Sequence, residues 1–99
     1  MTFVNMGSLE ARPGRRDELV ALLIRSNPRM REVGCLRYDV GVDEESPDSV
    51  FVAELWESRE AHRASLELDE VRATIAEAMP LLTGAMSGQH FSVVGSPLD

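Results

Sequence analysis

Residues 50–62, VFVAELWESREAH, contain the only tryptophan of the chain and one of its two histidines. In the first half of this stretch, apolar residues occupy both odd-numbered and even-numbered positions, which project from opposite faces of a strand. This pattern predicts a strand over 49–57. Ser58 follows as a good helix N-cap, and a helix is expected to continue through Leu68. This strand, followed directly by a helix, is the starting point for predicting the rest of the fold.

Three further segments are rich in strand-forming residues and alternate between apolar and polar positions. Strands are therefore predicted over 2–10, 35–42 and 85–95. In the second of these, Leu36, Tyr38 and Val40 are expected on one face and Cys35 on the other. The polar turn that follows, at 43–49, is short, so the strands on either side of it should pair antiparallel.

Two helical regions are predicted between these strands. The first follows a turn at 11–14 that contains a proline, a residue suited to the first helical turn. It should end at Asn27-Pro28, because the residue before a proline avoids helical geometry. The region after Ser58 is expected to break at Asp69 and to continue as a second helical piece over 70–79.

The resulting order, β-α-β-β-α-β, predicts an α+β fold of the ferredoxin-like type, with a four-stranded antiparallel sheet and helices on one face. The 99 residues are expected to form one domain, with 96–99 as a short tail. Phe51 and Leu55 project from one face of the third strand, and Val52 and Trp56 project from the other. Since the helices can cover only one face, a second copy of the chain is the economical cover for the other. A homodimer is therefore expected.

The composition excludes several classes of partner. Ten basic and seventeen acidic residues give a net charge of −7, which repels nucleic acids and anionic lipids. The longest apolar run, at 19–24, is far too short to span a bilayer, and the N-terminus does not resemble a signal peptide. Cys35 is the single cysteine, as expected in a reducing cytoplasm. We expect a cytoplasmic protein that binds neither nucleic acid nor membranes.

Several side chains could line a reaction site or only shape a core. Glu54 and Trp56 project from the same strand face; the glutamate could form a salt bridge at a sheet margin or act as a buried proton acceptor. Trp56 could pack in the core or form a cavity wall. His62 lies in the first or second turn of the following helix, whereas His90 lies in the last strand among small neighbours. Asn5, on the first strand, must find hydrogen-bond partners if it is buried.

Cofactor and metal motifs are not readable in the sequence. Two histidines without a nearby pattern of carboxylates and cysteines do not predict a zinc site, so no metal ligands are assigned. The sequence has no nucleophile elbow, P-loop or dinucleotide fingerprint. The protein is expected to be colourless and to work without a cofactor.

Three segments taken together resemble the antibiotic biosynthesis monooxygenase family over nearly the whole chain. They are ARPG at 11–14, GCLRY at 34–38 and ELWESREA at 54–61. The resemblance implies a dimeric α+β barrel, in agreement with the order of elements. Family members include cofactor-free oxygenases that convert phenols or quinols to quinones, and the resemblance implies this activity. Other members degrade haem or isomerise signalling sugars.

The chain departs from family positions in three places. Many relatives carry a histidine about nine residues beyond the Trp56 position, where this chain has Ser65. The stretch 71–79 lacks the histidine that binds iron in the haem-degrading branch. Trp56 matches the tryptophan that helps to hold the substrate in quinone-forming members. Val52 stands near the expected position of their asparagine, and Asn5 on the neighbouring strand could replace it.

The first hypothesis is therefore a cofactor-independent monooxygenase that combines a small phenol-like or quinol-like aromatic compound with dioxygen. A dry pocket, a base and donors to the developing oxyanion are enough for such chemistry. The expected base is His62 or His90. Four residues are expected to bind the substrate: Trp56 and Asn5 as donors, together with Tyr38 and Glu54. The alternatives are a non-catalytic ligand-binding or dimerisation module on the same fold, or a cofactor-free isomerase.

Overall fold

A computed structural model describes residues 1–98 and shows four strands and four helices. The strands are β1 (Phe3–Ala11), β2 (Cys35–Gly41), β3 (Ser49–Trp56) and β4 (Leu82–Ser92). The helices are α1 (Arg16–Leu23), α2 (Arg29–Glu32), α3 (Arg59–Ser65) and α4 (Asp69–Ala78), and the short 3-10 helix η1 (Met79–Leu81) joins α4 to β4. The predicted α+β order is confirmed, with α2 as an addition.

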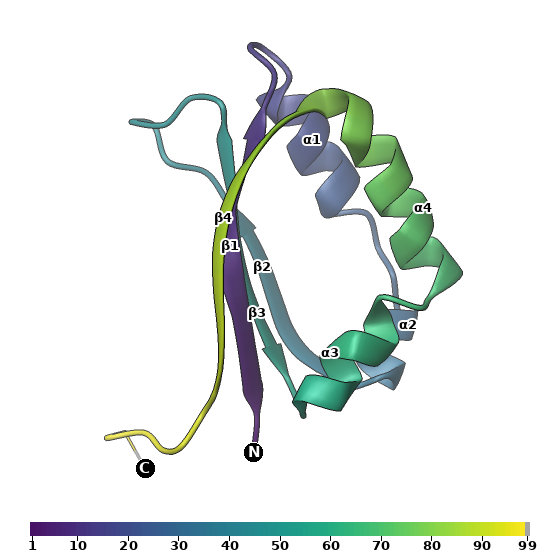
Figure 1. Cartoon of the computed structure of the whole chain (residues 1–99), viewed down its shortest axis with the longest axis vertical. Helices are drawn as coiled ribbons and strands as arrows, with labels where there is room; N and C mark the ends of the chain where they lie inside the picture. Colours follow the sequence, from purple (N-terminus) through teal and green to yellow (C-terminus); the bar gives the residue numbers. More distant parts are fainter. Residues whose placement is uncertain (99) are drawn as a thin grey trace.

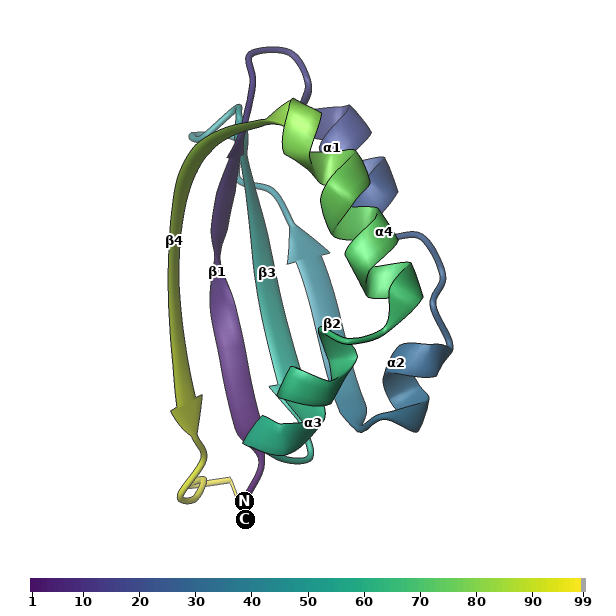
Figure 2. The ribbon, with the colours of Figure 1, turned by 45° about the vertical axis from the view of Figure 1, so that its right-hand side comes forward.

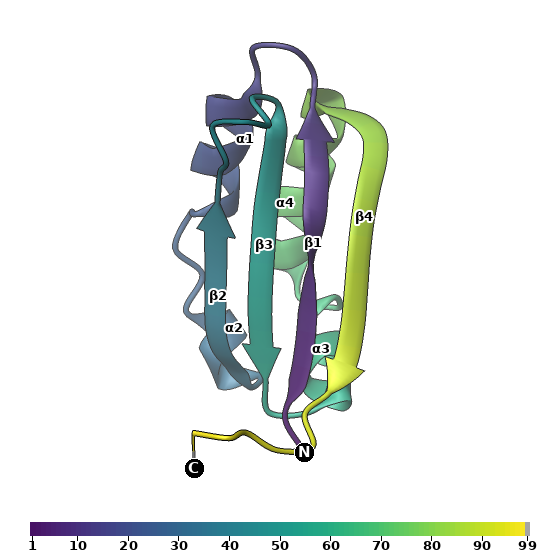
Figure 3. The same cartoon turned by 90° about the vertical axis from the view of Figure 1, so that its left-hand side faces the viewer.

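The strands form one antiparallel sheet in the order β2-β3-β1-β4. This is the ferredoxin-like arrangement. The two strands that are followed by helices, β1 and β3, lie side by side in the centre of the sheet, and β4 forms one edge. Figures 1 and 2 show all four helices on the same side of the sheet. Figure 3 shows the other side, where the strands lie in front of the helices without a covering layer. The predicted arrangement of helices on one face is confirmed.

The connection between α1 and β2 differs from the prediction. Helix α1 ends at Leu23, before Asn27-Pro28, and the unpredicted helix α2 starts immediately after the proline. The backbone angle φ of Pro28 is −63°, which suits the residue that begins a helix. The same proline therefore starts a second helix instead of marking the end of a single longer one.

Two strand predictions need correction. The last strand runs over 82–92 instead of 85–95, because its first residues pair with the end of β1, where Ala11 lies opposite Leu82. In β2 the register shifts between Cys35 and Arg37, which lie opposite Trp56 and Leu55 of β3. This irregularity breaks the strict alternation, and Cys35 consequently lies buried against Trp56.

The buried apolar residues form two clusters between the sheet and the helices. One cluster packs α1 and the end of α4 on the sheet, and its buried residues are Ala11, Leu19, Val50, Ala78 and Leu81. The other lies near α2 and α3 and consists of Phe3, Cys35 and Trp56. Within residues 1–98, no helix has the length and apolar character needed to cross a bilayer.

Candidate active site

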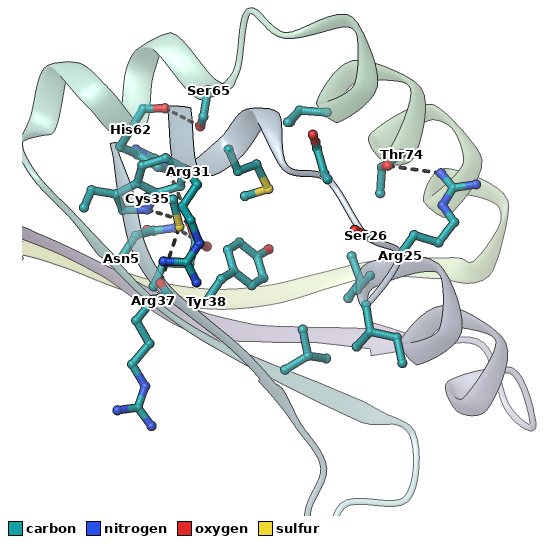
Figure 4. A pocket seen from close by; sticks show the side chains of 18 of the residues that line it. Asn5, Arg25, Ser26, Arg31, Cys35, Arg37, Tyr38, His62, Ser65 and Thr74 are labelled. Atoms are coloured by element: carbon teal, nitrogen blue, oxygen red, sulfur yellow. Dashed lines mark hydrogen bonds and ion pairs between the residues drawn. The ribbon is translucent and has the colours of Figure 1, made fainter. Parts of the chain in front are cut away.

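A cavity of about 680 Å³ lies between the helices and the sheet, and residues from both apolar clusters line it. This volume falls in the range of small-molecule sites. The apolar residues of its wall include Leu22, Leu23, Ile24, Met30, Val40, Leu66, Val71 and Ile75. Figure 4 shows polar side chains at both ends of the cavity, with Asn5, Tyr38 and His62 at one end and Arg25, Ser26 and Thr74 at the other. An aromatic molecule could therefore be held by apolar contacts while one end meets polar groups.

Sheet register brings three polar side chains into one row at the end of the cavity that contains His62. Asn5 of β1 and Tyr38 of β2 both lie opposite Glu54 of β3. Residues directly opposite each other on neighbouring strands share a face, so all three side chains project toward the helices. All three line the cavity.

Glu54 is a buried carboxyl group whose two oxygen atoms each accept a hydrogen bond. Its residue is only 7% exposed. Asn5 Nδ2 donates to Oε2 at 2.9 Å, and Trp56 Nε1 donates to Oε1 at 3.0 Å. Burial raises the pKa of Glu54 above the ordinary range, and the two hydrogen bonds oppose that rise. The carboxyl group is thus held in one orientation by donors from β1 and β3.

His62 is positioned by the start of α3. The side-chain oxygen of Ser58 accepts a hydrogen bond from the Ala61 backbone N–H at 3.0 Å, which confirms the predicted N-cap. Gly34 has a φ of +110°, and a Cβ atom there would lie only 2.8 Å from Ala61 Cβ. Glycine at this position therefore allows α3 to approach the start of β2 closely.

The imidazole of His62 lies against aromatic rings and faces Glu54. Its centroid is 5.4 Å from that of Trp56, in an edge-on arrangement, and 5.7 Å from that of Phe3. Its Nε2 atom is 3.9 Å from Oε1 of Glu54, too long for a hydrogen bond but close enough for electrostatic interaction. The ring is therefore fixed with one nitrogen toward the buried carboxyl group.

Burial lowers the pKa of His62, and the nearby His90 lowers it further. A lowered pKa keeps the imidazole neutral near pH 7, which is the form that accepts a proton. A carboxylate at Glu54 would stabilise the imidazolium formed after proton uptake. His62 could therefore act as a general base, with the Glu54 carboxylate stabilising its protonated form.

Tyr38 supplies a hydroxyl group that remains protonated. Its pKa is raised, chiefly by burial and then by the negative charge of Glu54. A hydroxyl group in that state donates a hydrogen bond to an oxyanion. Ser65, also in the cavity wall, donates its own hydroxyl hydrogen to the carbonyl oxygen of His62 at 2.6 Å.

The structure brings together most of the side chains singled out from the sequence. Asn5, Tyr38, Glu54, Trp56 and His62 all line the cavity. Among residues 1–98, no arginine forms a salt bridge with Glu54; its hydrogen-bond donors are Asn5 and Trp56. Both of these expected donors therefore point at Glu54, and Trp56, which has a single N–H, has none left for a substrate.

His90 is placed differently from the other candidates. It is exposed and does not belong to the cavity lining. Its ring lies against Phe3, with the centroids 5.7 Å apart, and His90 lies opposite Asn5 in the sheet. Of the two histidines, only His62 reaches the cavity in residues 1–98.

Some lining residues were not singled out from the sequence. Arg31 and Met30 belong to α2, the helix that was not predicted, so no local signal pointed to them. Ser65 was noted only as the residue at a family histidine position. Among residues 1–98, no group of three or more histidine, cysteine, aspartate or glutamate side chains could hold a metal ion.

Comparison with known proteins identifies a family match. The family model described as antibiotic biosynthesis monooxygenase matches residues 2–77. A structure from Chloroflexus aurantiacus, provisionally described as an antibiotic biosynthesis monooxygenase, is 36% identical, with a TM-score of 0.86 over 97% of this chain and 96% of that chain. No match is found among curated proteins.

Two more distant structures share the fold alone. A protein from Mycobacterium tuberculosis is 20% identical, with a TM-score of 0.82 over 98% of this chain and 99% of that chain. A protein from Deinococcus radiodurans, provisionally described as an antibiotic biosynthesis monooxygenase, is 23% identical, with a TM-score of 0.81 over 95% and 94% of the two chains.

Proposed function

The chain belongs to the antibiotic biosynthesis monooxygenase family, and from this premise we propose that it is a cofactor-independent monooxygenase acting on a small phenol-like or quinol-like aromatic compound. One observation supports the proposal above the others. His62, whose pKa is lowered, and Tyr38, whose pKa is raised, line the same largely apolar cavity, in which Glu54 is buried. Removal of a phenolic proton in such a site would leave an electron-rich ring that can reduce dioxygen directly.

The proposed reaction balances without another electron donor. A phenol and dioxygen give a quinone and water; the ring supplies all four electrons. After loss of the phenolic proton, a C–O bond forms between oxygen and the para carbon of the ring. The O–O bond of the resulting peroxide then breaks while the proton on that carbon leaves. One oxygen atom remains as the second quinone carbonyl, and the other becomes water.

Glu54 and the side chains around it each have a proposed role. His62 takes the phenolic proton, and the Glu54 carboxylate stabilises the resulting imidazolium. The Tyr38 hydroxyl donates to the oxyanion on the ring. Asn5 and Trp56 act through Glu54 as positioning residues, since both donate to its oxygens. His90 receives no role in proton transfer, because it lies outside the cavity lining.

The working form is proposed to be a homodimer in the cytoplasm. On the uncovered face of the sheet, Met6, Phe51 and Phe91 are 42%, 38% and 46% exposed. Large apolar side chains grouped on an open sheet face favour burial against another protein surface. The same face of a second copy would bury these side chains. The cavity of each chain lies between the sheet and the helices and would remain outside this interface.

Oxygen uptake with 1-naphthol tests the proposed activity. The expected products are 1,4-naphthoquinone and water, and with ¹⁸O₂ one labelled oxygen should enter the quinone. Addition of catalase should return no oxygen, since no hydrogen peroxide is formed. Release of hydrogen peroxide, or a quinone that takes its new oxygen from water, would contradict the mechanism. Binding of aromatic compounds without any oxygen uptake over a panel of phenols would favour the binding-module alternative.

A further inference from the structure

Arg31 brings a positive charge to the cavity wall beside the proposed substrate. It belongs to α2, and its carbonyl oxygen accepts a hydrogen bond from the Gly34 N–H at 3.2 Å. Arg29, on the same helix, pairs with Glu70 of α4 at 3.4 Å. The backbone that carries Arg31 is therefore tied to neighbouring elements. Figure 4 shows the Arg31 side chain among the cavity-lining residues, and its charge acts on the nearby Cys35 thiol.

The other two arginines of the cavity wall are already engaged. Arg25 pairs with Glu77 at 2.6 Å, and Arg37 pairs with Asp39 at 2.7 Å. Figure 4 shows the Arg37 side chain pointing away from the cavity. For Arg31, by contrast, no carboxylate of residues 1–98 lies within ion-pair distance. In a chain with a net charge of −7, acidic partners are plentiful, and this guanidinium has none.

The buried carboxyl group does not use the charge of Arg31. The hydrogen-bond donors to Glu54 are Asn5 and Trp56, and the pKa of this carboxyl group is shifted by burial and by these two hydrogen bonds. The Cys35 thiol is influenced by both charges. Its pKa is raised mainly by burial and also by Glu54, whereas a backbone hydrogen bond with Arg37 and the charge of Arg31 lower it. Cys35 thus lies within reach of two opposite charges in the cavity wall.

We propose that Arg31 is a specificity-determining residue that selects aromatic molecules with a carboxylate or another anionic substituent. The planar guanidinium can bind a carboxylate through two parallel hydrogen bonds. The apolar cavity wall would hold the ring, and the anion would pair with the guanidinium of Arg31. This inference rests on the cavity of the proposed function, and it names the class of substrate that the cavity prefers.

A matched pair of ligands tests the proposal without any turnover. The full chain is titrated with 2-naphthoate and with the neutral 2-naphthamide, and binding is followed by the NMR signal of the Trp56 indole N–H, the only one in the chain. Naphthoate should bind at least 10-fold more tightly than the amide, and added salt should weaken naphthoate alone. The variant Arg31→Gln should lose this preference, and Arg31→Lys should keep part of it.

Arg63→Gln is the control, because it removes the same charge from an exposed position on α3 outside the cavity lining. This variant should keep the full preference. Equal binding of the two ligands by the unaltered protein, no binding of naphthoate at millimolar concentration, or an unchanged preference in Arg31→Gln would each overturn the proposal. Binding is measured apart from oxygen uptake, so the two proposals can fail separately. The naphthoate preference can hold where 1-naphthol is not oxidised, and 1-naphthol can be oxidised where naphthoate is not preferred.

Discussion

The indole N–H of Trp56 is donated to Oε1 of Glu54, at 3.0 Å, and not to the cavity. Both residues are almost fully buried, at 1% and 7% exposure. Since they are two residues apart on β3, the strand itself places the donor beside the acceptor. Trp56 therefore influences the site by fixing the carboxyl group that faces His62.

Replacing Trp56 by phenylalanine should destabilise the fold by leaving Glu54 without one donor. A buried polar group that loses its partner costs about 1–3 kcal/mol, so the free energy of unfolding should fall by roughly that amount. Urea denaturation followed by far-UV circular dichroism would measure the loss. In a Glu54→Ala background the same replacement should cost less. If Trp56→Phe lowers the free energy of unfolding equally with Glu54 and with Ala at position 54, the Trp56–Glu54 hydrogen bond does not contribute to stability.

Stability should depend on pH through Glu54, whose folded-state pKa is raised by burial. Such a group stabilises the fold fully below its unfolded-state pKa, near 4.5, and that contribution is lost as the pH rises through the folded-state value. The unaltered protein should therefore lose stability relative to Glu54→Gln as the pH rises from 4 toward neutrality. Denaturation curves of both proteins over this interval give the difference directly. A difference that moves in the other direction would mean that the hydrogen bonds outweigh burial.

Removal of the imidazole of His62 should slow oxygen uptake with a productive phenol by roughly 10²- to 10⁴-fold, the usual contribution of a positioned general base. The matched variant, His90→Ala, should retain a rate within a few-fold of the unaltered protein, because His90 lies outside the cavity lining. Circular dichroism would confirm that both variants are folded. A large loss in the His90 variant alone would transfer the base role to that residue.

The pH profile should report the environment of His62. Its pKa is lowered from 6.5 by burial and by His90, so the acid limb of kcat/KM should lie below pH 6.5. His90→Gln removes one of the two causes and should move this limb toward higher pH. Initial rates over pH 4.5–8 would provide both profiles. An acid limb above pH 6.5 would be inconsistent with a buried neutral histidine as the base.

The uncovered sheet face should mediate dimer formation. Phe51→Glu places a charge on that face and should yield a monomer, of 10.9 kDa for the unaltered sequence, at micromolar concentration. The control Ala73→Glu adds the same charge at an exposed position of α4 and should leave the dimer intact. Light scattering after size-exclusion chromatography distinguishes the two sizes. A monomeric unaltered protein would remove the proposed interface.

The sequence was sufficient for features that depend on neighbours along the chain. The alternation in 49–57 predicted β3, and Ser58 was recognised as the N-cap of α3 because its oxygen reaches a backbone N–H only three residues away. The order of these local elements then led to the ferredoxin-like sheet. The departure at Pro28 was also local, but a proline is compatible both with the end of one helix and with the start of another.

The site itself was decided by tertiary structure. Glu54 could be predicted to share a strand face with Trp56, but its contact with Asn5 depends on the register of two strands 49 residues apart in sequence. The irregular pairing of Cys35 reversed its expected face for the same reason. The choice between His62 and His90 also required the fold, because it depends on which ring packs against Trp56 at the cavity. Periodicity specifies the face of an element, whereas register and packing determine which side chains meet across it.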